Sequence, residues 1–543
     1  MEKAHITSTA LAAMDLRQKV GQMIQAGFDG LEPSKEIIEL IEKHHLGGVI
    51  LFARNVQDVN QVAALTDKLQ QAALNSGHIP LWISIDQEGG MVARITEGVA
   101  LMPGQMAISA GGDPGAAYDA ANLCGQELRT LGINMNFAPD LDVNVNPDNP
   151  VIGVRSFGES PQSVADFGAE AIRGYRDAGV VAVAKHFPGH GDTNVDSHLD
   201  LPTISHPRER IDQVELLPFH EAIDAGVEAI MSSHIVFPAF ESSKLPATLS
   251  PAVLTGLLRE ELGFGGVIVT DCMEMQAISD HFGTVQAAVM AVEAGADSIL
   301  ISHRYELQIG AIEAIVAAVE SGIISEERID RSVERLLALK RKRLAEATAS
   351  MAIEQVGSWE HREKARVISE ASMTLVKDDN GYLPLQHADT LVIQMEAAVS
   401  SVVDETLHMP LTLGRALSAA GIRTEERMIP ASKAGEELEV LHELAERFEQ
   451  IVVGTYNASF HPGQVQLVKE LQRTGKRLIV VALRNPYDIK QFPDISTYLA
   501  AYESRPLALQ SIARCLTGVI PAKGRLPVTL GPEYQAGWGG SRL

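Results

Sequence analysis

Eight short apolar runs, separated by amphipathic stretches, occupy the first two-thirds of this 543-residue chain. They are continuous and rich in β-branched residues, as strands buried on both faces of a sheet are. Eight alternating strand and helix units favour a (β/α)8 barrel over an open sheet. The runs are Gln22–Phe28, Gly48–Phe52, Leu81–Asp86, Asn134–Val143, Val180–His186, Ala229–Val236, Gly266–Asp271 and Ser298–His303.

Several of the intervening stretches carry helix start and stop signals. Ser160 and Ser250 each precede a proline and an amphipathic stretch, a pairing that is typical of a helix N-terminus. Gly179 and Gly263 follow these two stretches, where helices commonly end. A further helix after Ser325 would complete the barrel.

The remainder of the chain predicts a smaller α/β domain with a mostly parallel sheet. We therefore expect a barrel over residues 1–348, a linker over 349–375 and a C-terminal α/β sandwich domain over 376–543. The strand candidates of this last part are Thr390–Ile393, Gln450–Gly454, Arg477–Ala482 and Thr497–Tyr502.

The charge balance excludes some classes of partner. The chain has 45 Lys and Arg against 70 Asp and Glu, which gives a formal net charge of −25. Phosphate groups would be repelled at long range, so we predict neither nucleic acid nor an anionic membrane as the main partner. No apolar run approaches the roughly 20 residues that a membrane span needs.

The N-terminal residues and the cysteines favour a cytoplasmic location. The start of the sequence lacks the continuous apolar core of a signal peptide, so secretion is expected only if a leader has been removed. Cys124, Cys272 and Cys515 are odd in number and far apart in the sequence, which predicts reduced thiols and no disulfide framework.

Polar side chains gather where several of the predicted strands end. The active site of a (β/α)8 barrel lies at the C-terminal ends of its strands and in the loops that follow. We therefore expect a pocket at this end of the barrel. The residues concerned include Asp86, Glu88, Arg94, Asp140, Asp142, Arg155, Lys185, His186, His234 and Asp271.

The loop after the fifth strand has two possible interpretations. It contains His186, His190 and His198 together with Asp192 and Asp196, and both residue types are good ligands for zinc-type ions. However, neither the HxH nor the HExxH spacing is present, so we favour acid–base chemistry over a metal site. In Asp196-Ser197-His198 a carboxylate can orient an imidazole and favour its protonated form, which can donate and recover a proton.

Asp271 also has two interpretations. It follows the apolar run Val267-Ile268-Val269-Thr270, and an acidic residue at the tip of a buried strand is costly unless it is paired or functional. It could attack an electrophilic carbon and form an ester. It could instead cap the N-terminus of a helix that begins near Met273.

At these positions the sequence resembles glycoside hydrolase family 3, specifically its β-N-acetylhexosaminidase branch. The resemblance covers almost the whole chain and implies the same order of a (β/α)8 barrel and a smaller α/β sandwich. The motifs that carry it are IDQEGGMVAR (Ile85–Arg94), NPVIGVRSFG (Asn149–Gly158), KHFPGHGDTNVDSH (Lys185–His198) and VTDCMEM (Val269–Met275).

The resemblance implies a role for each matching residue. Asp271 would be the nucleophile, and His198 would be the proton donor and acceptor with Asp196 as its partner. Because this branch uses the histidine loop, we do not expect the C-terminal domain to supply the catalytic acid. No metal or organic cofactor is implied. The residues that would hold the sugar in the −1 subsite are Asp86, Arg94, Arg155, Lys185 and His186.

The implied activity is that of an exo-acting retaining β-N-acetylglucosaminidase, in a monomer or weak dimer. Its substrates would carry terminal N-acetylglucosamine, either on muropeptides in peptidoglycan recycling or on chitin oligosaccharides. A neutral histidine does not repel phosphate, so phosphorolysis stays open as an alternative. A β-glucosidase or β-xylosidase of the same family is a second alternative, and a catalytically inert sugar-binding protein is a third.

Overall fold

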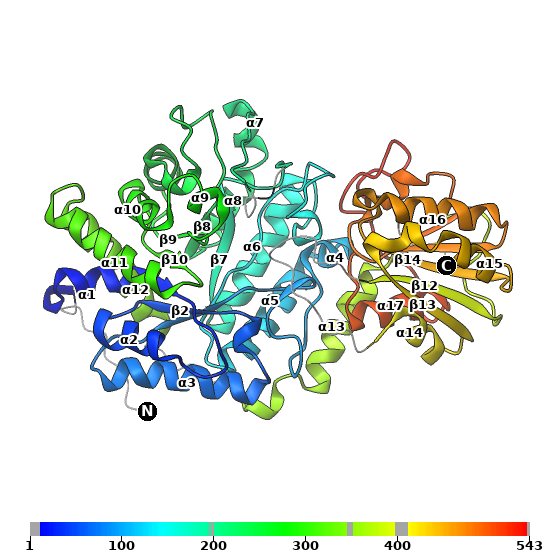
Figure 1. Ribbon diagram of the computed structural model, residues 1–543, viewed down its shortest axis with the longest axis horizontal. Helices are drawn as coiled ribbons and strands as arrows, with labels where there is room; N and C mark the ends of the chain where they lie inside the picture. The colour runs from blue at the N-terminus through cyan, green and yellow to red at the C-terminus, as the bar shows by residue number, and fades with distance from the viewer. Residues whose placement is uncertain (1–10, 195, 197–199, 345–350, 397–410, 540–543) are drawn as a thin grey trace.

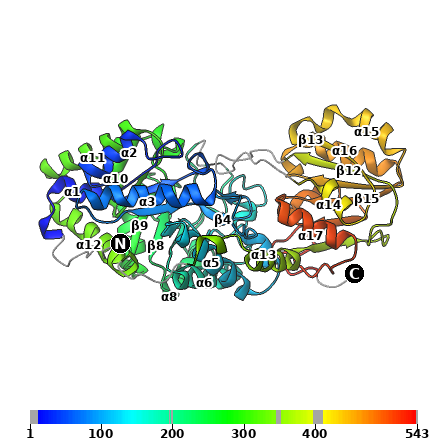
Figure 2. The same ribbon diagram turned by 90° about the horizontal axis from the view of Figure 1, so that it is seen from below.

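The computed structural model of the chain describes residues 11–194, 196, 200–344, 351–396 and 411–539. A barrel and a second domain lie side by side along the long axis, with α13 (Trp359–Ser372) at their junction (Figures 1 and 2). Each has its own cluster of buried apolar side chains. None of the helices in the described part of the chain is long and apolar enough to cross a membrane.

The barrel sheet contains one strand from each of the eight apolar runs, so the predicted (β/α)8 barrel is confirmed. All of its strand pairs are parallel, in the order β10-β1-β2-β3-β6-β7-β8-β9. A parallel bridge between Val269 and Ser298 joins the two ends of this order. The strands are β1 (Ile24–Ala26), β2 (Gly48–Leu51), β3 (Trp82–Ile85), β6 (Met135–Asn136), β7 (Val181–Phe187), β8 (Ala229–Ser232), β9 (Val267–Thr270) and β10 (Ile299–Ile301).

Helices surround this sheet, and the capping signals place several of their ends. The Ser160 hydroxyl accepts a hydrogen bond from the Ser163 amide at the start of α6, and Gly179 ends that helix in the left-handed region with φ of 81°. The larger helices are α2 (Lys35–His44), α3 (Val59–Asn75), α5 (Pro114–Thr130), α6 (Pro161–Ala178), α8 (Leu217–Asp224), α10 (Thr284–Ala294), α11 (Tyr305–Glu320) and α12 (Glu326–Leu344).

Shorter elements complete the barrel. The helix expected after Ser250 is present over Ala252–Glu261, but it is wound as a π-helix. A two-stranded antiparallel hairpin of β4 (Gln87–Gly89) and β5 (Val92–Ala93) follows β3. The short helices are α1 (Leu16–Gln22), α4 (Gln105–Ala110), α7 (Arg208–Gln213) and α9 (Gln276–Ser279).

The second domain contains a six-stranded sheet in the order β11-β16-β15-β14-β12-β13, in which only β11 is antiparallel to its neighbour. This confirms the smaller, mostly parallel α/β domain. Its strands are β11 (Thr374–Asp378), β12 (Thr390–Glu396), β13 (Thr424–Pro430), β14 (Gln450–Thr455), β15 (Arg477–Ala482) and β16 (Thr497–Ala500). Its helices are α14 (Leu413–Ala419), α15 (Leu438–Ala445), α16 (Pro462–Arg473) and α17 (Pro506–Leu516).

The two edge strands of this sheet, β11 and β13, are not predicted from the sequence. β13 has the sequence TEERMIP and is mostly half-buried or exposed, because an edge strand has only one covered side. It therefore lacks the apolar run that identified the central strands. β11 follows α13 directly and lies at the other edge. The boundaries at residues 348 and 375 stay a prediction.

Candidate active site

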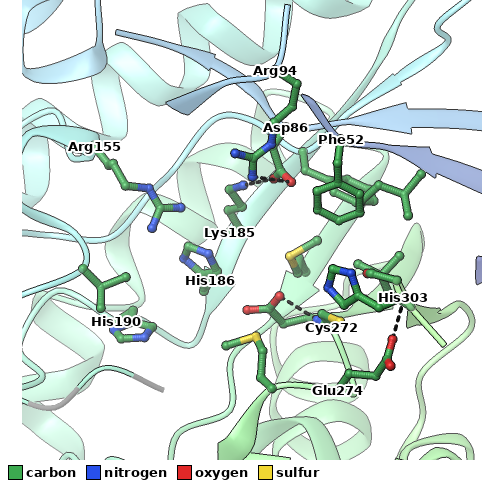
Figure 3. Close-up of a pocket in the computed structure, with 18 of the residues that line it drawn as sticks. Phe52, Asp86, Arg94, Arg155, Lys185, His186, His190, Cys272, Glu274 and His303 are labelled. Atoms are coloured by element: carbon green, nitrogen blue, oxygen red, sulfur yellow. Dashed lines mark hydrogen bonds and ion pairs between the residues drawn. The ribbon is translucent and has the colours of Figure 1, made fainter. Parts of the chain in front are cut away.

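A cavity of about 530 Å³ opens among the loops at the C-terminal ends of the barrel strands. Six of the eight residues that the sequence analysis assigned to the site line it, as expected for the active-site end of a barrel. Figure 3 shows Asp86, Arg94 and Lys185 together on one side and Cys272 with Glu274 on the other. The six residues are Asp86, Arg94, Arg155, Lys185, His186 and Asp271.

Asp86 lies directly after β3 and is held by two cations. The Lys185 ammonium donates to Oδ1 at 2.7 Å, and Nη2 of Arg94 lies 3.4 Å from Oδ2. Burial raises the pKa of Asp86, but the charges of Lys185 and Arg94 outweigh it and lower the pKa below its ordinary value. The carboxylate is therefore ionised at neutral pH and can accept hydrogen bonds from a bound ligand.

A second layer of charge lies behind this contact and was not assigned a role from the sequence. Glu88 of β4 accepts two hydrogen bonds from Arg155, from Nε at 3.0 Å and from Nη2 at 2.8 Å. The same carboxylate lies 2.8 Å from Nζ of Lys185. Burial raises the pKa of Glu88, but Arg155 and Lys185 outweigh it and hold the pKa well below its ordinary value. Glu88 thus fixes both cations at the wall of the cavity.

His186 follows Lys185 on β7 and is oriented by a buried carboxylate. Its Nδ1 lies 2.6 Å from Oδ2 of Asp142. Burial lowers the pKa of His186 to about 4 and raises that of Asp142 to about 6, so at neutral pH a neutral imidazole faces an ionised carboxylate. Nδ1 then carries the proton and Nε2 is left as an acceptor. Burial and the nearby Asp142 raise the pKa of Asp140 well above its ordinary value.

Asp271 follows β9, with one carboxylate oxygen accepting a hydrogen bond from the Cys272 amide at 2.7 Å. The next helix, α9, begins at Gln276, so Asp271 does not cap a helix that begins near Met273. Asp271 lines the same cavity as Asp86 and Lys185. His234, two residues after β8, has its Nε2 3.0 Å from the carbonyl oxygen of Cys272 in this turn.

Comparison with known proteins identifies the family. Residues 15–339 match the family model described as "Glycosyl hydrolase family 3 N terminal domain". The chain belongs to glycoside hydrolase family 3. A "Beta-hexosaminidase A" of Pseudoalteromonas piscicida is 36% identical over 91% of this chain and 91% of its own length. Its similarity to such proteins places this family 3 member in the β-N-acetylhexosaminidase branch.

Solved structures agree in fold and in chain length. A glycoside hydrolase family 3 β-N-acetylglucosaminidase from Paenibacillus sp. str. FPU-7 has 52% identity and a TM-score of 0.92, covering 95% of this chain and 99% of that one. A β-glucoside phosphorylase has a TM-score of 0.82 at 22% identity, with coverage of 98% and 97%, which shows a shared fold alone.

The predicted dyad of Asp196 and His198 is only partly covered by the described residues of this family 3 chain. Asp196 is buried at 5% exposure. Burial lowers the pKa of His190, and the negative charge of Asp196 offsets a smaller part of this effect by raising that pKa. His198 lies outside the described residues, and its role stays a prediction.

Asp140, Asp142 and His186 form a group whose potential ligand atoms lie within 4.8 Å of one another. Their contacts suit a hydrogen-bonded network better than a metal site. Nη2 of Arg155 lies 3.5 Å from Asp140, and a guanidinium at that position opposes a cation. Asp142 accepts hydrogen bonds from the His186 and His190 backbone amides as well as facing the His186 ring.

Four further residues that were not assigned to the site from the sequence also line the cavity. Phe52 and His303 end two of the predicted apolar runs, and their rings lie 5.3 Å apart. Glu274 accepts a hydrogen bond from the His303 amide at 2.6 Å. His190 was considered only as one of the loop histidines. All four follow the ends of barrel strands, so the reasoning that found Asp86 could have found them.

Proposed function

We propose that this chain is an exo-acting retaining β-N-acetylglucosaminidase, which removes terminal N-acetylglucosamine from muropeptides or chitin oligosaccharides. The observation that carries the proposal is the placement of Asp271 in one cavity with the Asp86, Lys185 and Arg94 cluster. A carboxylate that faces a set of hydrogen-bonding charges is the arrangement needed to hold a sugar and attack its anomeric carbon. The high identity to a family 3 β-N-acetylglucosaminidase supports the choice of sugar.

The cluster around Asp86 would bind the hydroxyl groups and the acetamido carbonyl of the terminal sugar. Charge-assisted hydrogen bonds are shorter and stronger than neutral ones, and the ionised Asp86 accepts while Lys185 and Arg155 donate. Nε2 of neutral His186 would accept a hydrogen bond from one further sugar hydroxyl. These contacts orient the anomeric carbon toward Asp271.

In the first displacement, an oxygen of Asp271 attacks the anomeric carbon while the bond to the leaving-group oxygen breaks. The leaving group takes a proton from the imidazolium of His198, and a glycosyl ester of Asp271 forms. The Cys272 amide hydrogen bond holds one carboxylate oxygen of Asp271, which orients the side chain for attack.

In the second displacement, the neutral His198 removes a proton from water as that water attacks the same carbon. The ester bond to Asp271 breaks, which restores the carboxylate and the imidazolium. Two inversions give net retention at the anomeric carbon. Asp196 would orient His198 and favour its protonated form.

Trapping the ester tests the proposal. The enzyme is incubated with a 5-fluoro-N-acetylglucosaminyl fluoride, digested and analysed by peptide mass spectrometry. The expected adduct lies on the peptide that contains Asp271, and Asp271→Ala should not form it. An adduct on a different side chain would overturn the assignment of the nucleophile.

Product analysis tests the exo mode and the alternatives. Digestion of chitotetraose should release only monomer from one end at early times.

One relative, a "Beta-N-acetylglucosaminidase/beta-glucosidase" of Cellulomonas fimi, is 29% identical over 96% of this chain and 94% of its own length. Nitrophenyl glucoside and xyloside are therefore compared with the N-acetylglucosaminide, and formation of sugar 1-phosphate in phosphate buffer would support phosphorolysis. Tight sugar binding without turnover would support an inert binding protein.

A further inference from the structure

Two loops of the second domain contact the barrel loops that lie behind the cavity. We call them the interface loops: residues 483–487 follow β15, and residues 501–505 follow β16. β4 lies on the side of the barrel that faces the second domain (Figure 2). Met91 and Val154 of the barrel belong to the apolar cluster of the second domain, so the two bodies are packed together at this place.

The first interface loop contacts the segment that carries Arg155. Oδ1 of Asn485 accepts a hydrogen bond from the Val154 amide at 3.1 Å, one residue before Arg155. Gly153 has φ of 46°, and a Cβ at this position would lie 2.4 Å from Oδ1 of Asn485. Asn485 is 4% exposed. The side chain therefore lies against the backbone that sets the position of the Arg155 guanidinium.

The second interface loop contacts the hairpin that carries Glu88. Oε1 of Glu503 accepts a hydrogen bond from the Gly104 amide. A Cβ at Gly90 would lie 2.6 Å from the same oxygen, so the absence of a side chain there permits this close approach. Nη2 of Arg505 donates to the Met91 carbonyl at 3.0 Å. Arg505 thus binds the turn between β4 and β5, and Glu503 packs against Gly90 of the same turn while it binds the Gly104 amide.

The two contacts act on the two ends of one ion pair. Glu88 and Arg155 bind each other, and Glu88 also lies 2.8 Å from Lys185 at the cavity wall. A shift of either segment would move the guanidinium of Arg155 or release the ammonium of Lys185. Misplacement of a binding group by about 1 Å can cost on the order of 100-fold in rate.

We propose that Asn485 and Glu503 are positioning residues, through which the second domain sets the geometry of the Arg155, Glu88 and Lys185 group in the barrel cavity. The proposal rests on the proposed function for its kinetic readout. It differs from a purely stabilising role of the second domain, which would change the amount of folded enzyme but not the properties of each folded molecule.

Steady-state kinetics on nitrophenyl N-acetylglucosaminide test the proposal. Asn485→Ala removes the acceptor for the Val154 amide, and kcat/KM per folded molecule should fall on the order of tenfold, mainly through KM. Asn485→Asp keeps an oxygen acceptor and should restore most of the loss. Glu503→Ala should resemble Asn485→Ala, whereas Glu503→Gln, which keeps Oε1, should retain more activity.

Ser511→Ala is the matched control. It removes a buried hydrogen bond between α17 and α13, in which the Ser511 and Ser369 hydroxyl oxygens lie 2.9 Å apart, and it contacts no part of the cavity. Its kcat and KM should equal those of the wild type even if its Tm falls. If folded Asn485→Ala and Glu503→Ala both keep kcat and KM as the control does, the proposal is wrong.

Hydrogen exchange on the wild type provides a second measurement if the alanine variants do not fold. Peptides that contain Val154 and Gly104 should exchange more slowly when N-acetylglucosamine is bound, and a peptide that contains Ser511 should not change. Unchanged exchange at both sites in saturated enzyme would overturn the proposal. If the proposed function is wrong, the wild type itself shows no turnover. If only this inference is wrong, the wild type is active and the kcat and KM values of the variants equal those of the wild type.

Discussion

Glu88 and Arg155 form a two-pronged ion pair behind the cavity, with side chains that are only 2% and 3% exposed. Such a pair is shielded from solvent, so removal of one partner leaves the other as a buried charge without compensation. Lys185 shares the Glu88 carboxylate, which makes this acid the common partner of two cations at the cavity wall. The pair thus connects the stability of the fold to the arrangement of charges at the cavity wall.

Glu88→Gln should therefore reduce both the free energy of unfolding and kcat/KM. We expect the free energy of unfolding to fall by about 3 kcal/mol, because removal of one partner of a buried ion pair typically costs this much. The kcat/KM value should fall at least tenfold, because Arg155 and Lys185 lose their common anchor. Chemical denaturation and steady-state kinetics measure the two effects. Glu97→Gln, at an exposed position of the following loop, is the control and should change neither.

Asp271→Ala should lower kcat for nitrophenyl N-acetylglucosaminide by about a thousandfold or more, as expected for loss of a nucleophile. Binding of N-acetylglucosamine, measured by calorimetry, should persist because the Asp86 and Lys185 contact remains. Azide should restore turnover and give the α-glycosyl azide, since it attacks from the vacated side. Asp280→Ala, at the exposed C-cap of α9, should behave as the wild type. A β-azide product would point to a different nucleophile.

His198→Ala tests the acid–base assignment made from the sequence. The variant should hydrolyse a dinitrophenyl glycoside, which needs little protonation, with a smaller loss than chitobiose, whose leaving group must be protonated. A difference of about tenfold between the two losses is expected. His206→Ala serves as a control, since His206 pairs with Asp192 of the same loop. Equal losses on both substrates would count against His198 as the acid.

Lys340 gives the barrel a pH-dependent stability that is separate from catalysis. The ammonium donates to Oε1 of Gln22 at 3.0 Å and to the Gly47 carbonyl at 2.8 Å, and burial lowers its pKa to about 7. In the unfolded chain its pKa is about 10.4. Between these two pKa values the unfolded state binds more protons than the folded state, so the free energy of unfolding falls as the pH is lowered from about 10 to 7.

Lys340→Met removes this dependence. The difference in free energy of unfolding between variant and wild type should favour the variant more at pH 7 than at pH 10, by on the order of 3 kcal/mol. Urea denaturation at the two pH values measures it. Lys43→Met, at an exposed lysine, should show no such change. If the Lys340→Met and wild-type curves stay parallel, the lysine titrates normally in the folded state.

The strands and the cavity residues could be predicted because both depend on local patterns. A strand covered on both faces must be apolar throughout, and Asp86, Lys185 and Asp271 stand out because they interrupt such runs at their ends. β13 could not be found in this way, since one of its sides is uncovered. The partners of Glu88 and Asn485 could not be found either. They lie 67 and 331 residues away along the chain, and only the folded backbone brings them together.

The loops after β3 and β6 meet the loops after β15 and β16 across the junction of the two domains. Changes of length in the turns after β15 or β16 would therefore be transmitted to the cavity wall, although these turns are remote from it in sequence. Diversification of substrate preference in this architecture need not start in the barrel. A library confined to the second domain could alter which sugars are accepted while every barrel residue stays unchanged.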